Sequence, residues 1–517
     1  MAYMISKIKH LALLGLLAAS TLAFQIREKA VWQSKYVSIA KDGTLHYTPD
    51  AQGNVIPDFS RVGYQQGDRE IPDIRVRKTV RPARSGSSQE IIQQAIDEVA
   101  IRKPDKYGFR GAILLKKGTY SIPGTLHIRQ SGIVLRGEGD GENGEKGTVL
   151  VASGAGKRTL LEITGQGDRK EIPGTRRKIT DELVPTGAMS FILESADGLR
   201  TGDNIIVYRP GTDNWIRDIK MDQIEARHNT KQWQAQEYSL AFERTITKID
   251  GDKVYLDNPI VMTMESKYGG GEVYKYTFED RISEVGVEHI RFESAYASDT
   301  DEDHGWMAVS MDKVENAWVR NTTSRYFGYA AVSLGSLAKQ ITVRDSRNFE
   351  PKSLIHGGRR YAFDNNGQLN LFMNLKATEG RHDYITGAKT LGPNVFYNCT
   401  AQNTHADIGP HHRWAVGTLY DNVTTDGEIN VQDRGNWGSG HGWSGVTQVL
   451  WNCTAKSTTV QSPWASGKNY CIGLQGEKTL GRFPDRPDGE WEGQNQPELN
   501  LPSLYLAQLK ARRSLKK

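Results

Sequence analysis

The sequence predicts an all-β protein, a right-handed parallel β-helix with an N-terminal capping α-helix, an inserted lobe and a short C-terminal helix. The first observation is a short sequence pattern that returns at intervals of 24, 24 and 30 residues. The second is that no helix of crossover length separates the repeated strands, which excludes a doubly wound α/β sheet. Units of this kind stack side by side, and each coil covers the apolar row of its neighbour.

The chain begins with features typical of an export signal. Lys7 and Lys9 precede an apolar run from Leu11 to Ala23, which is too short to span a membrane. We therefore expect residues 1–23 to be a signal peptide that is cleaved near Ala23, giving a secreted or periplasmic protein. No second apolar run follows, so no membrane span is expected. Residues 24–80 are assigned to an N-terminal extension.

The net charge of +5 comes from the two ends of the chain. Without the two lysines of the signal and five cations among the last eight residues, the remainder carries −2. A body so close to neutral has no broad basic face, and we do not expect nucleic acid as a partner. We expect a monomer. The three cysteines are an odd number, which argues against a disulfide framework.

A helix is predicted in front of the first coils. The segment Ser87-Ser88-Gln89-Glu90 has the pattern of a capping box and opens a helix that extends to about Arg102. Its apolar stripe consists of Ile91, Ile92, Ala95, Ile96, Val99 and Ala100. Such a helix can cover the open end of the β-helix and hide its strand edge.

The β-helix itself is expected over residues 81–480. Segments 111–120 and 132–139 are predicted to form its first coils. Residues 196–260 depart from the repeat, and we expect them to form the inserted lobe. The stretch 481–517 is assigned to a linker, rich in Pro, Gly and Asp, and a short terminal helix over 504–515.

The repeat is clearest between residues 372 and 456. Each copy places an asparagine after a β-prone pair, at Asn374, Asn398, Asn422 and Asn452. We expect residues 286–475 to form successive coils in which these four asparagines stack at one corner. The residues that follow them, among them Cys399 and Cys453, would form an inward apolar row. These two cysteines would lie about 10 Å apart, too far for a disulfide, and are predicted to be buried and unpaired.

Two segments carry a family resemblance. Gly-Ala-Ile-Leu-Leu-Lys-Lys-Gly-Thr-Tyr at 111–120, behind the predicted cap helix, and Gly-Ile-Val-Leu-Arg-Gly-Glu-Gly at 132–139 resemble the pectate-lyase-like β-helix superfamily. The resemblance covers roughly residues 80–480 and implies the fold and a carbohydrate substrate. It leaves the reaction open, because that superfamily contains lyases, hydrolases, epimerases and non-catalytic tailspike relatives.

Three polar clusters recur on successive predicted coils. They lie at 380–384, 405–414 and 432–443. Arg381 comes seven residues after Asn374 and His405 seven after Asn398, so the two are expected on adjacent coils about 5 Å apart. Asp383 and Asp407 are expected to stack in the same way.

An Arg- and His-rich patch suits β-elimination of a uronate. Arginine neutralises the carboxylate of the sugar, and histidine can take the C5 proton or protonate the leaving oxygen. We therefore predict a polysaccharide lyase whose partner is an acidic polysaccharide. The candidate catalytic residues are Arg381, His382, His405, His411, His412 and Arg413. The candidate substrate-binding residues are Arg359, Tyr384, Arg434, Trp437, His441 and Trp443.

Two other functions stay open. Asp383 and Asp407 could be the carboxylic acid pair of a glycoside hydrolase, although nearby Arg381 and His405 would hold both acids ionised. The same two residues could equally be a structural ladder. The third alternative is a non-catalytic glycan-binding β-helix, for which aromatic and amide side chains would suffice.

The reaction requires no cofactor on this interpretation, with Ca²⁺ as an open alternative. The acidic run of Asp299, Asp301, Glu302 and Asp303 could bind Ca²⁺, which prefers clustered oxygen ligands. A solvated loop is the alternative that we favour. His411 and His412 are adjacent and would point apart on a strand, which makes them poor partners for a metal there.

Overall fold

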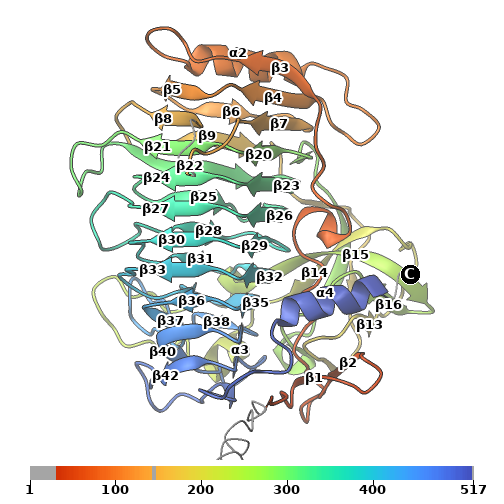
Figure 1. The fold of residues 1–517 in the computed structure, drawn as a ribbon. Coiled ribbons are helices and arrows are strands. Elements are labelled where there is room, and N and C mark those ends of the chain that lie inside the picture. The colour runs from red at the N-terminus through yellow and green to blue at the C-terminus, as the bar shows by residue number, and fades with distance from the viewer. Residues whose placement is uncertain (1–30, 143–146, 515–517) are drawn as a thin grey trace, which may run out of the picture.

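The computed structural model describes residues 31–142 and 147–514. The predicted signal peptide, residues 1–23, lies outside this part of the chain. Figure 1 shows strands stacked in successive coils from α2 (Gln89–Ala100) at one end to the last coil at the other. No helix in the described residues is both long enough and apolar enough to cross a membrane.

Three parallel sheets form the walls of the coils, which confirms the predicted parallel β-helix. The first sheet contains, in order, β3 (Val76–Val80), β4 (Gly111–Leu115), β7 (Ile133–Arg136), β20 (Gly286–Glu288), β23 (Val314–Arg320), β26 (Lys339–Arg344), β29 (Leu371–Met373), β32 (Leu391–Tyr397), β35 (Ala415–Asp421), β39 (Val449–Trp451), β41 (Tyr470–Ile472) and β43 (Glu490–Glu492), with β19 (Ile282–Ser283) and β38 (Gly445–Val446) at its side.

The second and third sheets follow the first in each coil. The second contains β5 (Gly118–Ile122), β8 (Thr148–Ala152), β21 (Arg291–Ser294), β24 (Thr323–Arg325), β27 (Arg347–Phe349), β30 (Lys376–Thr378), β33 (Thr400–Gln402), β36 (Thr424–Thr425), β40 (Thr454–Val460), β37 (Glu428–Val431) and β42 (Gln475–Lys478). The third contains β6 (Leu126–Ile128), β9 (Arg158–Thr164), β22 (Gly305–Asp312), β25 (Ala330–Leu334), β28 (Phe363–Asn365), β31 (Tyr384–Thr386) and β34 (Gly409–Pro410).

The asparagine ladder is confirmed at the corner between the first and second sheets. Asn374, Asn398, Asn422 and Asn452 follow neighbouring strands of the first sheet, and their φ angles lie between 51° and 55°. Asparagine tolerates this left-handed conformation better than other residues with a side chain. The side-chain amide of Asn398 donates to Asn374 at 2.8 Å, and that of Asn452 donates to Asn422 at 3.0 Å.

The interior of the coils is apolar along its length. Phe372, Phe396 and Tyr420 stack on consecutive coils, with ring centroids 4.7 and 5.3 Å apart. Cys399 and Cys453 lie in the same core, buried and unpaired as predicted, and Cys471 joins them. The thiols therefore serve as core side chains.

Helix α2 covers the first coil, as predicted. Ile92, Ala95, Ile96 and Val99 are buried in the core that continues through the coils. The predicted capping box forms only in part: the hydroxyl of Ser87 accepts the N–H of Gln89 at 3.1 Å, whereas the hydroxyl of Ser88 accepts the N–H of Ala83, also at 3.1 Å. Ser88 holds the incoming chain rather than the helix end.

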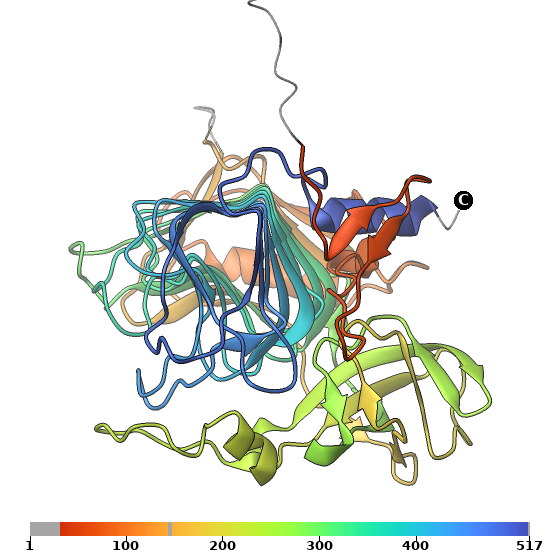
Figure 2. The ribbon, with the colours of Figure 1, turned by 90° about the horizontal axis from the view of Figure 1, so that it is seen from below.

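An antiparallel lobe is inserted between β9 and β19 (Figure 2). Its main sheet consists of β10 (Lys170–Glu171), β11 (Arg177–Lys178), β18 (Glu272–Thr277), β14 (Asn204–Arg209), β15 (Leu240–Asp250), β16 (Lys253–Leu256) and β13 (Ser190–Ile192). Beside it lie β12 (Leu183–Val184), β17 (Met264–Glu265), α3 (Asp213–Asp218) and the short 3₁₀ helices η2 (Ala235–Tyr238) and η3 (Ser266–Tyr268).

Apolar packing and buried polar contacts join the lobe to the coils. Buried apolar residues of the lobe pack against Trp414 and Trp443 of the β-helix. In addition, the buried carboxylate of Glu243 lies 2.7 Å from Arg281 and 3.2 Å from Lys339. A buried carboxylate is stable only with such partners, so these cations fix the lobe in place.

The two ends of the described chain pack beside each other on the first sheet. The hairpin of β1 (Val37–Ile39) and β2 (Leu45–Tyr47) lies near α4 (Leu504–Ser514), and η1 (Tyr64–Gly67) follows along the coils (Figure 1). The buried carboxylate of Asp421 accepts the hydroxyl of Ser503 and the N–H of Tyr505, both at 2.7 Å. These bonds dock the terminal helix, whose presence was predicted.

Candidate functional site

The second and third polar clusters, together with part of the first, form a cavity of about 550 Å³ beside the third sheet. It lies where the chain enters β28 and β31 and leaves β34. We call it the histidine pocket. It is lined by Gly357, Gly358, Tyr361, Arg381, His382, Asp407, His411, His412, Arg434, Trp437, Gly438 and His441.

His382 is held in one tautomer. Its Nδ1 lies 2.7 Å from the backbone carbonyl of Asp407. A carbonyl oxygen can only accept, so Nδ1 carries the proton and Nε2 keeps its lone pair. Nε2 is buried and has no hydrogen-bond partner among the described residues. Burial lowers the pKa of His382 to about 4, so the ring is neutral at neutral pH.

Three further histidines surround His382. The ring of His411 lies 4.5 Å from that of His382 and 5.2 Å from that of His441, and His412 and His441 are 4.9 Å apart. Burial lowers the pKa of His412 to about 4 and that of His441 to about 3, and it also lowers the pKa of His411. Neutral rings can pack this closely, whereas several imidazolium ions would repel one another.

The adjacent pair His411 and His412 is not on a strand. Both residues follow β34 on a turn, and their ring centroids lie 5.1 Å apart. The two side chains were expected to point apart only on a strand, and that condition does not apply here. Even so, no group of three or more His, Cys, Asp or Glu side chains in the described ranges is arranged to hold a metal ion.

An ion pair forms one wall of the histidine pocket. Arg434 donates to the carboxylate of Asp407, which also lies 3.5 Å from Nδ1 of His382. Burial alone would raise the pKa of Asp407, but Arg434 and His382 hold it below its ordinary value. Trp437 is 38% exposed, and the guanidinium groups of Arg434 and Arg482 lie 5.8 and 5.2 Å from its ring centroid. An exposed indole in a polar pocket can stack on a sugar face.

Tyr361 is a member of the pocket that the sequence patterns did not single out. Its hydroxyl lies 3.2 Å from Nε2 of His411, and its ring packs edge-on against His382 at 4.9 Å. Burial raises the pKa of Tyr361, so the phenol stays protonated. Arg381 lies on the same side and donates to the carbonyl of Gly357.

Two aromatic candidates lie in the protein core and do not line the pocket. Tyr384 is fully buried inside the coil, where its hydroxyl donates to the carbonyl of Thr400 at 2.5 Å. Trp443 is fully buried against the lobe, and its indole N–H donates to the carbonyl of Ile219 at 3.0 Å. Unlike the buried His382, neither of these side chains lines the histidine pocket, which corrects their assignment to substrate binding.

Three charged candidates also lie outside the pocket lining. His405 is exposed; only its backbone N–H reaches the neighbouring coil, at Gly380. Arg413 donates to the hydroxyl of Ser439 at 2.7 Å, and Arg359 forms an ion pair with Glu302. The backbone register of Arg381 and His405 is close to the expected one, but their side chains do not share a site.

The two aspartates of the hydrolase alternative have different surroundings. Asp407 lines the histidine pocket, whereas Asp383 is fully buried outside it, and neither of its carboxylate oxygens has a hydrogen-bond partner in the described part of the chain. Burial raises the pKa of Asp383 to about 7. The two carboxyl groups therefore do not form a pair that faces one substrate.

The acidic run at 299–303 is engaged in its own loop. The carboxylate of Asp301 accepts the N–H groups of Ala297 and Asp303, at 2.8 and 2.9 Å. Glu302 pairs with Lys157 and with Arg359. These bonds order the loop, and Ca²⁺ binding there stays the untested, less favoured alternative.

No protein-family model matches the chain, and no curated protein matches it in sequence. Among solved structures it is similar to the tailspike protein gp49 from Pseudomonas phage LKA1, at 14% identity and a TM-score of 0.44; the match covers 76% of this chain but only 56% of the tailspike. The alginate lyase from Paenibacillus sp. str. FPU-7 matches at 10% identity and a TM-score of 0.38, over 81% of this chain and 98% of the lyase. Pectate lyase Pel9A matches at 12% identity and a TM-score of 0.35, over 82% of each chain. What the chain shares with these proteins is the parallel β-helix.

Proposed function

We propose that the protein is a polysaccharide lyase that cleaves a uronic-acid-containing polysaccharide by β-elimination in the histidine pocket. The observation that carries this proposal is the state of His382. Its Nδ1–H is fixed on a carbonyl, no described residue bonds to its Nε2, and burial keeps the ring neutral. A buried neutral imidazole beside two arginines has the properties of a general base for a proton next to a carboxylate.

The reaction divides among three side chains. Arg381 forms no ion pair with a carboxylate of the described residues, so its charge is available to neutralise the carboxylate of the sugar. Nε2 of His382 then takes the C5 proton. The C4–O bond breaks as a C4=C5 double bond forms, and the hydroxyl of Tyr361 gives its proton to the leaving oxygen. The products are an unsaturated uronate and a new sugar end.

This assignment changes two roles that were expected from the sequence. Arg413, a catalytic candidate from the sequence, lies outside the pocket lining, and Tyr361 rather than a histidine is the proton donor. The lowered pKa values of His411 and His412 mean that these rings are not imidazolium acids at neutral pH, whereas the phenol keeps its proton. His405, another catalytic candidate, also lies outside the pocket lining and is left without a catalytic role.

A glycoside hydrolase is the weaker alternative. Hydrolysis requires two carboxyl groups on either side of the scissile bond, roughly 5 to 9.5 Å apart. Asp407 is the single carboxylate among the described residues that line the histidine pocket, and Arg434 already binds it. An acid that is ionised by an ion pair is a poor proton donor.

The test is to incubate the purified protein with a panel of polyuronates, with EDTA and with added Ca²⁺ in parallel. A lyase produces an ultraviolet absorbance from the conjugated double bond together with new reducing ends. New reducing ends without that absorbance would identify a hydrolase, and binding without cleavage would identify a glycan-binding protein.

The proposed base is tested by two variants on a substrate that the wild type cleaves. His382→Ala should lower kcat by about 10² or more, the usual contribution of a general base. His405→Ala is the matched control on the neighbouring coil and should keep kcat within about twofold of the wild type. Melting temperatures show that both variants are folded. Full activity of His382→Ala would contradict the assignment.

A further inference from the structure

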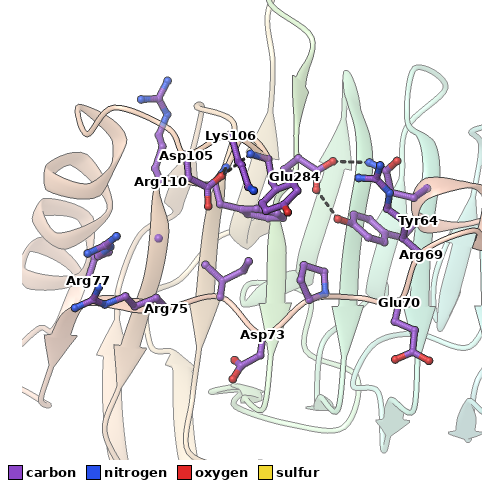
Figure 3. Close-up of a pocket in the computed structure, with 16 residues that line it drawn as sticks. Tyr64, Arg69, Glu70, Asp73, Arg75, Arg77, Asp105, Lys106, Arg110 and Glu284 are labelled. Carbon is purple, nitrogen blue, oxygen red and sulfur yellow. Dashed lines mark hydrogen bonds between the residues drawn. The ribbon is translucent and has the colours of Figure 1, made fainter.

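A second cavity, of about 980 Å³, lies near the α2 end of the β-helix, on the first sheet rather than the third. One wall is the extended segment 69–77, and the other is the loop 105–110 together with Glu284 (Figure 3). We call it the arginine cavity. Its lining includes five cations: Arg110, which donates to the carbonyls of Ser131 and Arg102, and four others, Arg69, Arg75, Arg77 and Lys106.

These four cations have no carboxylate partner at ion-pair distance. The ion pairs between described residues do not include any of the four, and their side-chain nitrogens make no hydrogen bond within the described ranges. The ammonium group of Lys106 lies 4.9 Å from the ring centroid of Tyr107, which is 59% exposed. The cavity therefore presents uncompensated positive charge next to an accessible aromatic ring.

The acids of the arginine cavity are directed or bonded elsewhere. Asp73 binds Arg136 at 2.8 Å, and Figure 3 shows Asp73 and Glu70 pointing away from the side on which Lys106 lies. The carboxylate of Asp105 accepts the N–H groups of Tyr107 and Phe109, at 2.8 and 3.0 Å.

The remaining acid, Glu284, is buried. Its carboxylate accepts the hydroxyl of Tyr64 and the amide of Gln65, both at 2.6 Å, and burial raises its pKa. Glu284 attracts Arg69 electrostatically, so the cavity cations without such an acid among the described residues are Arg75, Arg77 and Lys106.

The position of Arg77 depends on a glycine. Gly111 has φ +140°, and a Cβ atom there would lie 2.2 Å from Cγ of Arg77. The absence of a side chain at Gly111 leaves room for the stem of Arg77 against β4, while the Arg77 side chain stays exposed beside the cavity.

We infer that the arginine cavity binds a segment of an anionic polysaccharide outside the histidine pocket. Guanidinium groups grip carboxylates or sulfate esters through paired N–H donors, and the ring of Tyr107 can stack on a sugar face. The identity of the polymer rests on the proposed function. Because a polymer held at one site has a raised local concentration at another, the cavity would favour long substrates over short ones.

The experiment compares two triple variants by electrophoresis through gels that contain polygalacturonate, chondroitin sulfate or neutral dextran. Arg75→Gln, Arg77→Gln and Lys106→Gln together remove charge from the cavity. Arg129→Gln, Lys170→Gln and Arg200→Gln remove the same charge from exposed positions outside both cavities. Mobility in a polymer-free gel corrects for the change in net charge.

We expect the cavity variant to bind the polyanion at least about fivefold more weakly, and the surface variant to differ from the wild type by less than about twofold. Stronger loss on polygalacturonate than on chondroitin sulfate assigns the site to carboxylates, and the reverse assigns it to sulfate esters. Equal binding by the two variants, or a wild type that binds no polyanion, would overturn the inference.

A second measurement separates this inference from the proposed function. On a substrate that is cleaved, the cavity variant should raise KM for the polymer while kcat for a short oligosaccharide is unchanged. If the wild type binds the polymer through the cavity but cleaves nothing, the proposed function fails and the inference stands. If cleavage occurs and the cavity variant binds the polymer normally, the inference fails alone.

Discussion

At His382 and Tyr361, burial moves two pKa values in opposite directions. It lowers the pKa of the histidine to about 4 and raises that of the tyrosine above its ordinary value of 10.0. A base that is neutral above about pH 4 and an acid that keeps its proton into the alkaline range can act together over a wide interval. Activity should therefore rise through about pH 4 and stay level across neutrality.

Replacement of the proposed acid tests this pairing. Tyr361→Phe should lower kcat by about 10² or more, because it removes the proton donor and leaves the ring packing in place. The matched control is Tyr329→Phe on the preceding coil, whose hydroxyl donates to Asp364 at 3.1 Å and which does not line the pocket. The measurement is kcat against pH for both variants. Equal activity of the two would remove Tyr361 from the mechanism.

Asp383 should make stability depend on pH. Its pKa is about 7 when folded against a reference value of 3.8, so the folded chain keeps a proton that the unfolded chain has lost between these values. The free energy of unfolding therefore falls as pH rises from about 4 to 7, because the folded chain must keep or lose this proton at a cost that the unfolded chain does not have. Asp383→Asn should raise Tm at pH 8 and change it less at pH 4. Exposed Asp222→Asn is the control, and an equal shift at both pH values would contradict the argument.

At the scale of elements, α2 closes the core rather than merely lying on it. Ile92 is fully buried in the core of the coils, whereas its neighbour Ile91 is 37% exposed. Ile92→Ala should lower the free energy of unfolding by about 2–5 kcal/mol, because it removes buried methyl groups and leaves a cavity. Ile91→Ala should cost about 1 kcal/mol or less. Urea denaturation of both variants measures the difference, and equal losses would mean that the helix does not seal the coil.

The repeated elements could be predicted because their signal is local. Asn374 and Asn398 mark the same turn on coils of equal length, so counting residues places one above the other. Tyr361 and Arg434 could not be placed in this way, because they lie on coils of 29 and 30 residues whose extra residues form the pocket loops. Counting also gives the backbone register and not the surroundings of a side chain, so it could not show that Asp407 lines the pocket while Asp383 is buried outside it.

At the scale of the molecule, one apolar core runs through the coils from the cap helix to the last turns. It includes Val80 and Ile92 near one end and Cys471 and Leu474 near the other. Each coil contacts its two neighbours, so the stability of the β-helix is approximately a sum of coil and interface contributions. The lobe, the N-terminal segment and α4 add contacts along the second half (Figure 1).

The three thiols can be used to measure opening of the later coils, in which they lie. Cys399, Cys453 and Cys471 are buried, and burial raises the pKa of each, so neither access nor thiolate is available in the folded state. A thiol reagent should label them only as fast as their coils open, and immediately in denaturant. Labelling is followed by mass spectrometry in buffer and in urea. The Ile92→Ala variant is the comparison, because Ile92 and Cys471 lie near opposite ends of the core. If the coils open from the α2 end, this variant should have a lower Tm but nearly the same rate of Cys471 labelling in buffer. Rapid labelling of the native wild type would show that the core is open at these coils.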